Sequence, residues 1–193
     1  MAWSIADFRA QYADADVLQQ EVQNFRNEAG IPAMNELRNA GYHFLKAVDD
    51  VGALSSQDHL DNAVGHARRA NYEATEAGIV LAVAMVKKFQ EDYATVEVAD
   101  LVPEYVTRCS NCNEGLRLIE AGRLTGFDRS QDHSNRIALF RLIRPFAEDL
   151  TIARVEANKR ISSKRTDTRR FIITILLTIA CTAIAVAVAI AIG

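Results

Sequence analysis

Arg38, Asn39 and His43 lie within the short segment R-N-A-G-Y-H, and their types and spacing point more directly to chemistry than any other group in the chain. Histidine titrates near neutral pH, so it can take up or release a proton during a reaction. Arginine keeps its positive charge and can hold a phosphate oxygen. This segment could therefore supply a proton-transfer group together with a cation that stabilises negative charge.

The same segment resembles a known motif. Arg38 followed by asparagine, with histidine five positions after the arginine, is similar to the RxxxxH motif of HEPN domains, which are small helical bundles. Residues from about 30 to 90 look like the HEPN-like hairpins of bacterial membrane-associated defence proteins. The resemblance implies catalytic roles for Arg38, Asn39 and His43 in a dimeric ribonuclease. The motif lies in the first quarter of this chain, whereas it usually lies late in HEPN ribonucleases, so loss of catalysis is the alternative.

The apolar stripe of the surrounding helix predicts which way Arg38 and His43 point. Its expected members are Met34, Leu37, Gly41, Leu45 and Val48. At ~100° per residue, Arg38 lies about 80° and His43 about 140° from the centre of this stripe. His43 should then face water, a neighbouring helix or a second subunit. The alternative to a catalytic pair is a solvated histidine, with Arg38 paired to a carboxylate.

Two further groups could carry chemistry. His59 and His66 are seven residues apart and share a helix face. Together with Arg68 and Arg69 they line either the groove of His43 or a charged outer surface. Cys109 and Cys112 form a CxxC without the second pair that a structural zinc site needs. We expect two reduced thiols, with a zinc shared between subunits or with His133 as the alternative. No metal and no cofactor is predicted.

Residues 1–153 read as one all-α domain with a HEPN-like bundle of four to five helices. Prolines and glycines are few, and alanine, leucine, glutamate and arginine predominate. The apolar run 79–86 is the expected core. The helices are predicted at about 14–28, 32–52, 58–93, 103–124 and from 134 onward, the last with a kink at Pro145.

The last 23 residues contain no charge and no proline. A helix over 171–193 would be ~34 Å long, enough for a hydrocarbon core of ~30 Å, which predicts a single transmembrane helix. The preceding stalk, 154–170, has seven cations and two acids, so the N-terminal domain is expected on the cytoplasmic side of the inner membrane. Membrane lipid headgroups are the expected partners of Lys164, Arg165, Arg169 and Arg170.

The apolar segment also has small and weakly polar stripes. Small residues four apart let helices approach closely, which predicts a homo-oligomer. The threonines could line water or bond their own helix carbonyls. The expected assembly residues are Thr174, Thr178, Thr182, Ala183, Ala185, Ala187 and Ala189.

Charge and resemblance together shape the expected function. The chain has a net charge of −3, and because 154–170 contributes +5, the remainder sums to −8. RNA is therefore not indicated as a partner by charge. The sequence predicts a tail-anchored HEPN-like effector or accessory that oligomerises and perturbs or gates the membrane in antiphage defence, with an RNA-targeting CRISPR effector or another defence protein as its partner. The alternatives are a membrane-tethered ribonuclease using Arg38 and His43, and a non-catalytic scaffold.

Overall fold

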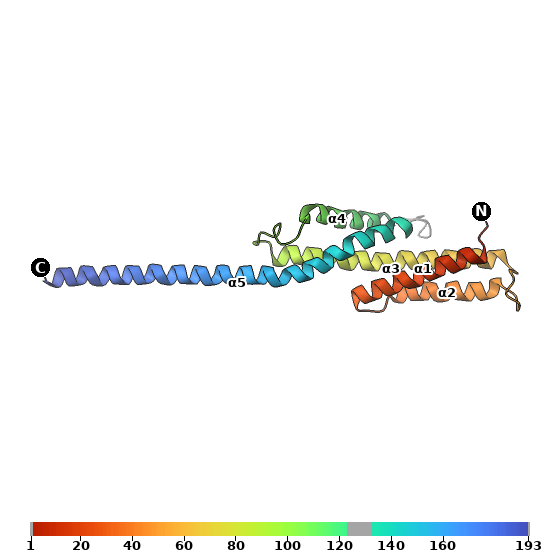
Figure 1. Ribbon diagram of the computed structural model, residues 1–193, viewed down its shortest axis with the longest axis horizontal. Helices are drawn as coiled ribbons and strands as arrows, with labels where there is room; N and C mark the ends of the chain where they lie inside the picture. The colour runs from red at the N-terminus through yellow and green to blue at the C-terminus, as the bar shows by residue number, and fades with distance from the viewer. Residues whose placement is uncertain (1, 123–132, 193) are drawn as a thin grey trace.

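The computed structural model describes residues 2–122 and 133–192, with the side chains of 180–192 left out. The described residues form five α-helices and no sheet, which confirms the all-α class and the helical bundle. Figure 1 shows their arrangement. The helices are α1 (Ile5–Arg26), α2 (Ile31–Ala47), α3 (Gln57–Asp92), α4 (Tyr105–Gly122) and α5 (His133–Ile192).

Helix α1 begins earlier than its apolar pattern predicts. Ser4 caps it: the Ser4 hydroxyl accepts from the Asp7 backbone N–H at 3.1 Å, and the Asp7 carboxylate accepts from the Ser4 N–H at 2.8 Å. This reciprocal pair satisfies two donors that a helix start would otherwise leave unpaired. The helix therefore starts at Ile5 and not near Asp14.

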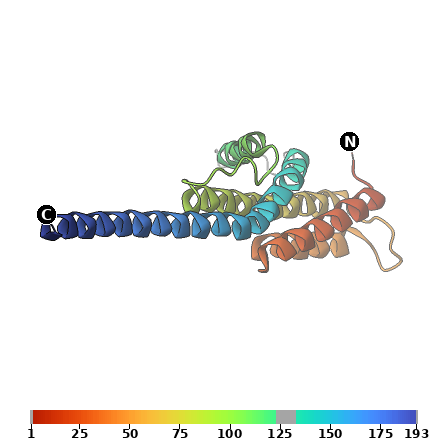
Figure 2. The same ribbon diagram turned by 60° about the vertical axis from the view of Figure 1, so that its left-hand side comes forward.

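Helix α3 is the central element against which the other helices pack. α1 and α2 lie along its first half, and α4 and the first part of α5 lie along its second half (Figure 1; Figure 2). Ile79, Ala82, Val83 and Val86 are buried within the largest apolar cluster, which confirms the core predicted at 79–86.

The buried face of α2 differs from the predicted stripe. Met34 and Leu45 are 47% and 74% exposed, while Ala40 and Ala47 are fully buried. Leu37 of the predicted stripe is buried as expected. Alanines occupy much of the remaining interface, because small side chains let the α2 backbone approach α3 closely. Relative to the face actually buried, His43 lies about 80° from its centre and Arg38 about 140°. His43 is therefore closer to the buried face than predicted, and Arg38 is farther from it.

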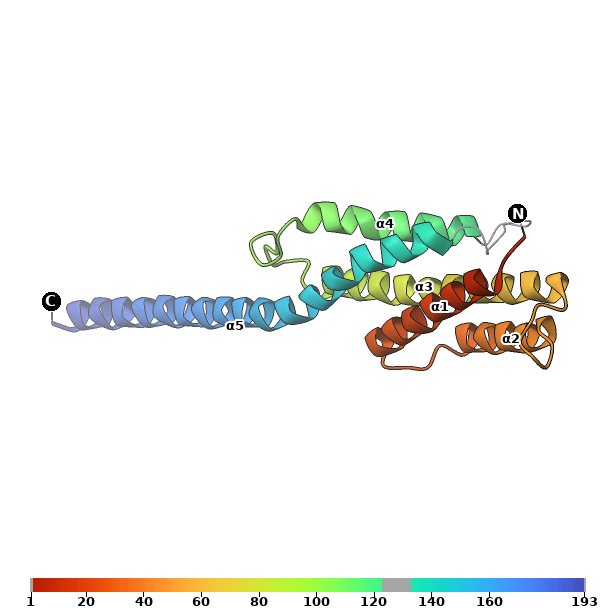
Figure 3. The ribbon, with the colours of Figure 1, turned by 45° about the vertical axis from the view of Figure 1, so that its right-hand side comes forward.

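Helix α5 is a single helix that continues through Pro145 and through the predicted boundaries at 153–154 and 170–171. Figure 2 shows that it bends between its first part, beside α4, and its long C-terminal part. Its first part packs on α3 and α4 through large buried side chains, as Figure 3 shows for the ribbon. Phe140 lies so close to α3 that a Cβ added at Gly78 would stand 2.5 Å from the Phe140 ring. Among the described side chains of α5, which end at Ile179, Ala157 is the last that is buried and Ile161 is the last that packs against the core.

The C-terminal part of α5 requires a correction. Within the described part of the chain, none of the helices combines the length and the apolar character needed to cross a membrane. The apolar segment with described side chains, 171–179, is about 13 Å long at ~1.5 Å per residue, well short of a ~30 Å hydrocarbon core. On this finding the predicted transmembrane helix at 171–193 is wrong, and so is the single-pass inner-membrane location inferred from it.

Candidate functional site

Three of the four histidines of the chain converge between α2 and α3. The Nδ1 atoms of His43 and His59 are 3.2 Å apart, within hydrogen-bond distance. The His43 and His66 rings are stacked, with centroids 5.2 Å apart and planes inclined by 20°. We call His43, His59, His66, Glu36 and Arg69 the histidine cluster. All five side chains are partly exposed, so solvent and a ligand can reach them.

Glu36 fixes one histidine and one arginine of the cluster. Its Oε2 lies 2.7 Å from His66 Nδ1 and 3.3 Å from Arg69 Nε. A carboxylate at 2.7 Å requires a proton on His66 Nδ1, which leaves Nε2 as the acceptor when the ring is neutral. The NH2 atom of Arg69 lies 3.0 Å from the same Nδ1. Since that Nδ1 already carries a proton, Arg69 is held beside the His66 ring by its ion pair with Glu36.

The local sequence explains why two helices bring these side chains together. Glu36 and His43 are seven residues apart on α2, as are His59 and His66 on α3, so each pair lies on one helix face. A tight loop reverses the chain between the helices. In it, Asp49 Oδ1 accepts from the Val51 and Ala53 N–H groups at 3.1 and 2.8 Å.

The ends of this loop set the register of the two helices. Gly52 has a φ of +80°, which favours glycine, and the Ser55 hydroxyl donates to the Ala47 carbonyl at 3.1 Å. The Ser56 hydroxyl then caps α3 by accepting from the His59 N–H at 3.4 Å. His59 is thereby placed in the first turn of α3, opposite His43.

The surroundings of His43 favour its neutral form. Partial burial lowers its pKa from the ordinary value, and the nearby positive charges of His66, His59, Lys46 and Arg69 lower it further. A neutral histidine beside two others is able to accept a proton while a neighbour donates one. The cluster can therefore carry out acid–base chemistry next to the fixed positive charge of Arg69.

The three motif residues are not all part of this arrangement. Arg38 is exposed and lies about 140° around the α2 axis from His43. Asn39 is half-buried and one turn before His43, on the same side of the helix. The structure brings His43 to His59, His66 and Arg69, and leaves Arg38 on the outer face of α2.

Glu36 is the member of the histidine cluster that the sequence interpretation does not identify. Its spacing of seven from His43 is the signal that places it on the same face. For His59, His66, Arg68 and Arg69 the sequence leaves two positions open. The structure places His59, His66 and Arg69 in the groove of His43. Arg68 instead lies over the Trp3 ring, 4.9 Å from its centroid.

The cysteine pair has no comparable environment. Cys109 and Cys112 are free thiols, and burial raises the pKa of Cys112 to about 11. Across 2–122 and 133–192, no group of three or more histidine, cysteine, aspartate or glutamate side chains is placed to hold a metal ion. A buried thiol with a raised pKa is a poor nucleophile and a poor ligand.

The residues predicted to mediate membrane assembly are described only in part. The Thr174 and Thr178 hydroxyls donate to the carbonyls of Arg170 and Thr174, each at 2.9 Å, so the hydroxyl proton of each is used within α5. The side chains of the other five, Thr182, Ala183, Ala185, Ala187 and Ala189, lie outside the described ones.

No protein-family model, curated protein or solved structure matches the chain. The HEPN resemblance, the role in antiphage defence and the CRISPR partner therefore stay predictions that rest on the sequence. A proposal of function therefore rests on the geometry of the chain itself.

Proposed function

We propose that the histidine cluster catalyses acid–base cleavage of RNA phosphodiesters. One observation carries the proposal: three of the four histidines in the chain, from two helices, converge beside an arginine at a partly exposed position. A purely structural role does not require three titratable rings at one place. The geometry thus supports the ribonuclease alternative with a changed set of residues, in which Arg69 replaces Arg38.

The chemistry requires no co-reactant. Neutral His43 takes the proton of a ribose 2′-hydroxyl, and the 2′-oxygen forms a bond to phosphorus. The bond between phosphorus and the 5′-oxygen breaks, and a protonated histidine of the cluster, His59 or His66, gives its proton to that oxygen. Arg69 neutralises the charge that develops on the phosphate oxygens. The products are a 2′,3′-cyclic phosphate and a free 5′-hydroxyl.

The test uses the purified full chain and a short single-stranded RNA with a fluorophore and a quencher at its ends. We expect cleavage that falls about 100-fold or more in His43→Ala and in His59→Ala, because each removes a proton-transfer group. An RNA analogue with 2′-methoxy groups should stay intact. Arg117→Ala, on the exposed surface of α4, is the matched control and should cleave at the parental rate. Absence of cleavage by the parental chain contradicts the proposal.

Comparing Arg69→Ala with Arg38→Ala separates the geometric assignment from the motif. If Arg69 holds the phosphate, only Arg69→Ala should reduce cleavage strongly. If Arg38→Ala abolishes cleavage and Arg69→Ala does not, the RxxxxH interpretation is correct and Arg69 does not hold the phosphate.

A second candidate function is self-association through the end of α5. Seven large apolar side chains between 171 and 179 are exposed, from 41% for Ile175 to 66% for Phe171. They are Phe171, Ile172, Ile173, Ile175, Leu176, Leu177 and Ile179. Full burial of such a side chain contributes ~1.5–3 kcal/mol, so covering this segment with further copies of α5 is strongly favoured.

Sedimentation of the full chain tests this candidate. We expect a multiple of the monomer mass, and we expect Leu176→Lys to lower it. The control is Ile152→Lys, since Ile152 is 74% exposed but lies on the packed part of α5. A parental chain that is monomeric, in buffer or in detergent, contradicts self-association.

A further inference from the structure

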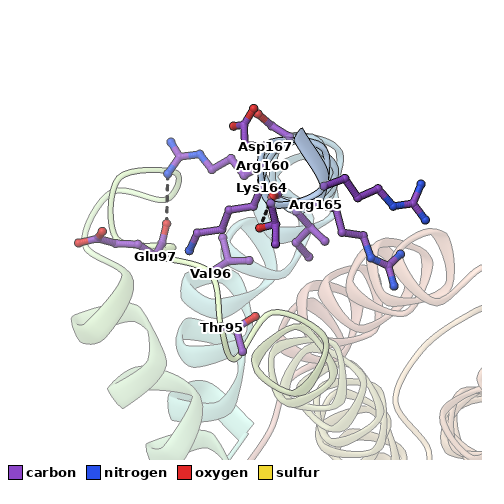
Figure 4. A pocket seen from close by; sticks show the side chains of 11 residues that line it. Thr95, Val96, Glu97, Arg160, Lys164, Arg165 and Asp167 are labelled. Atoms are coloured by element: carbon purple, nitrogen blue, oxygen red, sulfur yellow. Dashed lines mark hydrogen bonds between the residues drawn. The ribbon is translucent and has the colours of Figure 1, made fainter. Parts of the chain in front are cut away.

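A hollow of about 760 Å³ lies where α5 leaves the bundle. It is enclosed on one side by the connector between α3 and α4 at 95–97, and on the other by α5 at 160–169 (Figure 4). Neither the histidine cluster nor the apolar end of α5 contributes to it. We propose that this hollow binds the phosphate group of an organic phosphate.

The lining of the hollow is predominantly positive. Its cations are Arg160, Lys164, Arg165 and Arg169, and its acids are Glu97 and Asp167. Figure 4 shows Arg160 and Lys164 extending toward the connector, and Arg165 on the opposite side of the helix. The Arg160 guanidinium donates to the Glu97 carbonyl at 3.3 Å, which holds it at the edge of the hollow. Arg160 and Lys164 are therefore the cations best placed to meet a ligand there.

The pairing of the cations changes abruptly along α5. Four earlier cations have carboxylate partners: Arg141 with Glu21, Arg144 with Glu148, Arg154 with Asp92, and Lys159 with Glu156. Within the described residues, Lys164, Arg165 and Arg169 form no ion pair. Like charges four residues apart, as in Arg160 with Lys164 and Arg165 with Arg169, destabilise a helix. An anionic ligand would offset that repulsion.

The rest of the lining suggests what the phosphate is attached to. Val96 and Ile161 supply apolar surface, and Ser163 offers a hydroxyl. The volume is far larger than an inorganic phosphate and falls within the range of organic ligand sites. A phosphate on the cations with an organic group over Val96 and Ile161 fits this combination. Soluble phosphate esters and phospholipid headgroups share this chemistry.

Calorimetric titration of the full chain tests the site with adenosine monophosphate, inorganic phosphate and adenosine. We expect adenosine monophosphate to bind more tightly than inorganic phosphate, and adenosine not to bind. A second arm measures co-sedimentation with phosphatidylcholine vesicles, with and without phosphatidylglycerol. Binding to the anionic vesicles alone would assign the phosphate to a lipid headgroup, and binding of the nucleotide would assign it to a soluble ester.

The double variant Arg160→Ala/Lys164→Ala should weaken binding about tenfold or more, since each charge-assisted hydrogen bond to phosphate is strong. The control Arg144→Ala/Lys159→Ala removes the same charge from the same helix outside the hollow, and should change the affinity less than about twofold. Equal losses in the two double variants would show diffuse attraction and overturn the proposal. Failure of every phosphate probe to bind the parental chain would overturn it as well.

Discussion

The two parts of α5 on either side of Ile161 differ in almost every physical respect. Before Ile161, Phe140, Phe146 and Leu150 are buried, and four cations pair with carboxylates. From 162 to 179 every described residue is exposed, and α5 extends away from the other helices (Figure 1). The same helix therefore serves as a core element in one part and as a free surface in the other.

This difference shows which residues of α5 are needed for the fold and which are available for binding. Residues before Ile161 are constrained by packing, because replacing them changes the core. Residues after it are not constrained by the fold of the chain, so their basic and apolar character calls for another explanation. We attribute that character to binding.

The largest expected contrast is between two phenylalanines on the same helix. Phe146→Ala should lower the free energy of unfolding by about 3–5 kcal/mol, because it leaves a cavity in the core. Phe171→Ala should change it by less than about 0.5 kcal/mol, because Phe171 is exposed. Urea unfolding followed by circular dichroism measures both. Similar losses in the two variants would show that the end of α5 contributes to the fold.

The close approach of α3 to the packed part of α5 gives the next contrast. Gly78→Ala places a Cβ against the buried Phe140 ring and should lower the unfolding free energy by about 1–3 kcal/mol. Gly65 lies on the same helix, and a Cβ added there has no atom within 4 Å. Gly65→Ala should therefore raise the unfolding free energy by about 0.5–1 kcal/mol. Urea unfolding gives the sign of each change. Two changes of the same sign would contradict the packing of Phe140 against Gly78.

A smaller contrast concerns two arginines: Arg108 of α4, which packs on the first part of α5, and Arg165, which lies in the exposed part of α5. Arg108 pairs with Asp149 at 2.8 Å and lies 5.0 Å above the Phe146 ring. Arg108→Ala should cost about 1 kcal/mol, whereas Arg165→Ala should change stability by less than about 0.5 kcal/mol. Raising the salt concentration should reduce the first effect. Equal effects would mean that Arg165 has a partner in the fold.

The smallest expected effect is a pH slope at the histidine cluster. The pKa of His43 is lower in the folded chain than its ordinary value of 6.5, so the unfolded chain binds more protons. The resulting stability is present above about pH 6.5 and is lost as pH falls through the lower folded pKa. His43→Gln should flatten this slope between about pH 8 and pH 5. Tyr42→Phe, which alters the neighbour of His43 without titrating in this range, should leave the slope intact.

Much of the fold could be predicted from local signals in the sequence. Gly30 and Pro32 mark the start of α2, and Ser56 marks the start of α3, close to the observed bounds. The apolar pattern misplaces the start of α1, because the signal there is the capping pair Ser4 and Asp7 and not an apolar stripe. The pattern also misjudges the buried face of α2, because alanines, with little apolar surface of their own, decide how closely two helices approach.

The site was only partly predictable because it forms between helices. Spacing along one helix shows that His59 and His66 share a face, but it does not show that this face meets His43. That contact depends on the loop held by Asp49 and on the alanine interface of α2. A motif within one helix is easier to recognise, which is why the sequence points to Arg38 and not to Arg69.

The continuity of α5 through Pro145 has a mechanical consequence. The helix extends about 70 Å from Pro145 to Ile192 at ~1.5 Å per residue. Proline lacks the N–H that would bond to the preceding turn, so bending is easiest there. Each degree of bending moves the far end by about 1 Å over that length. A small change in packing around Pro145 therefore produces a much larger displacement at Ile192.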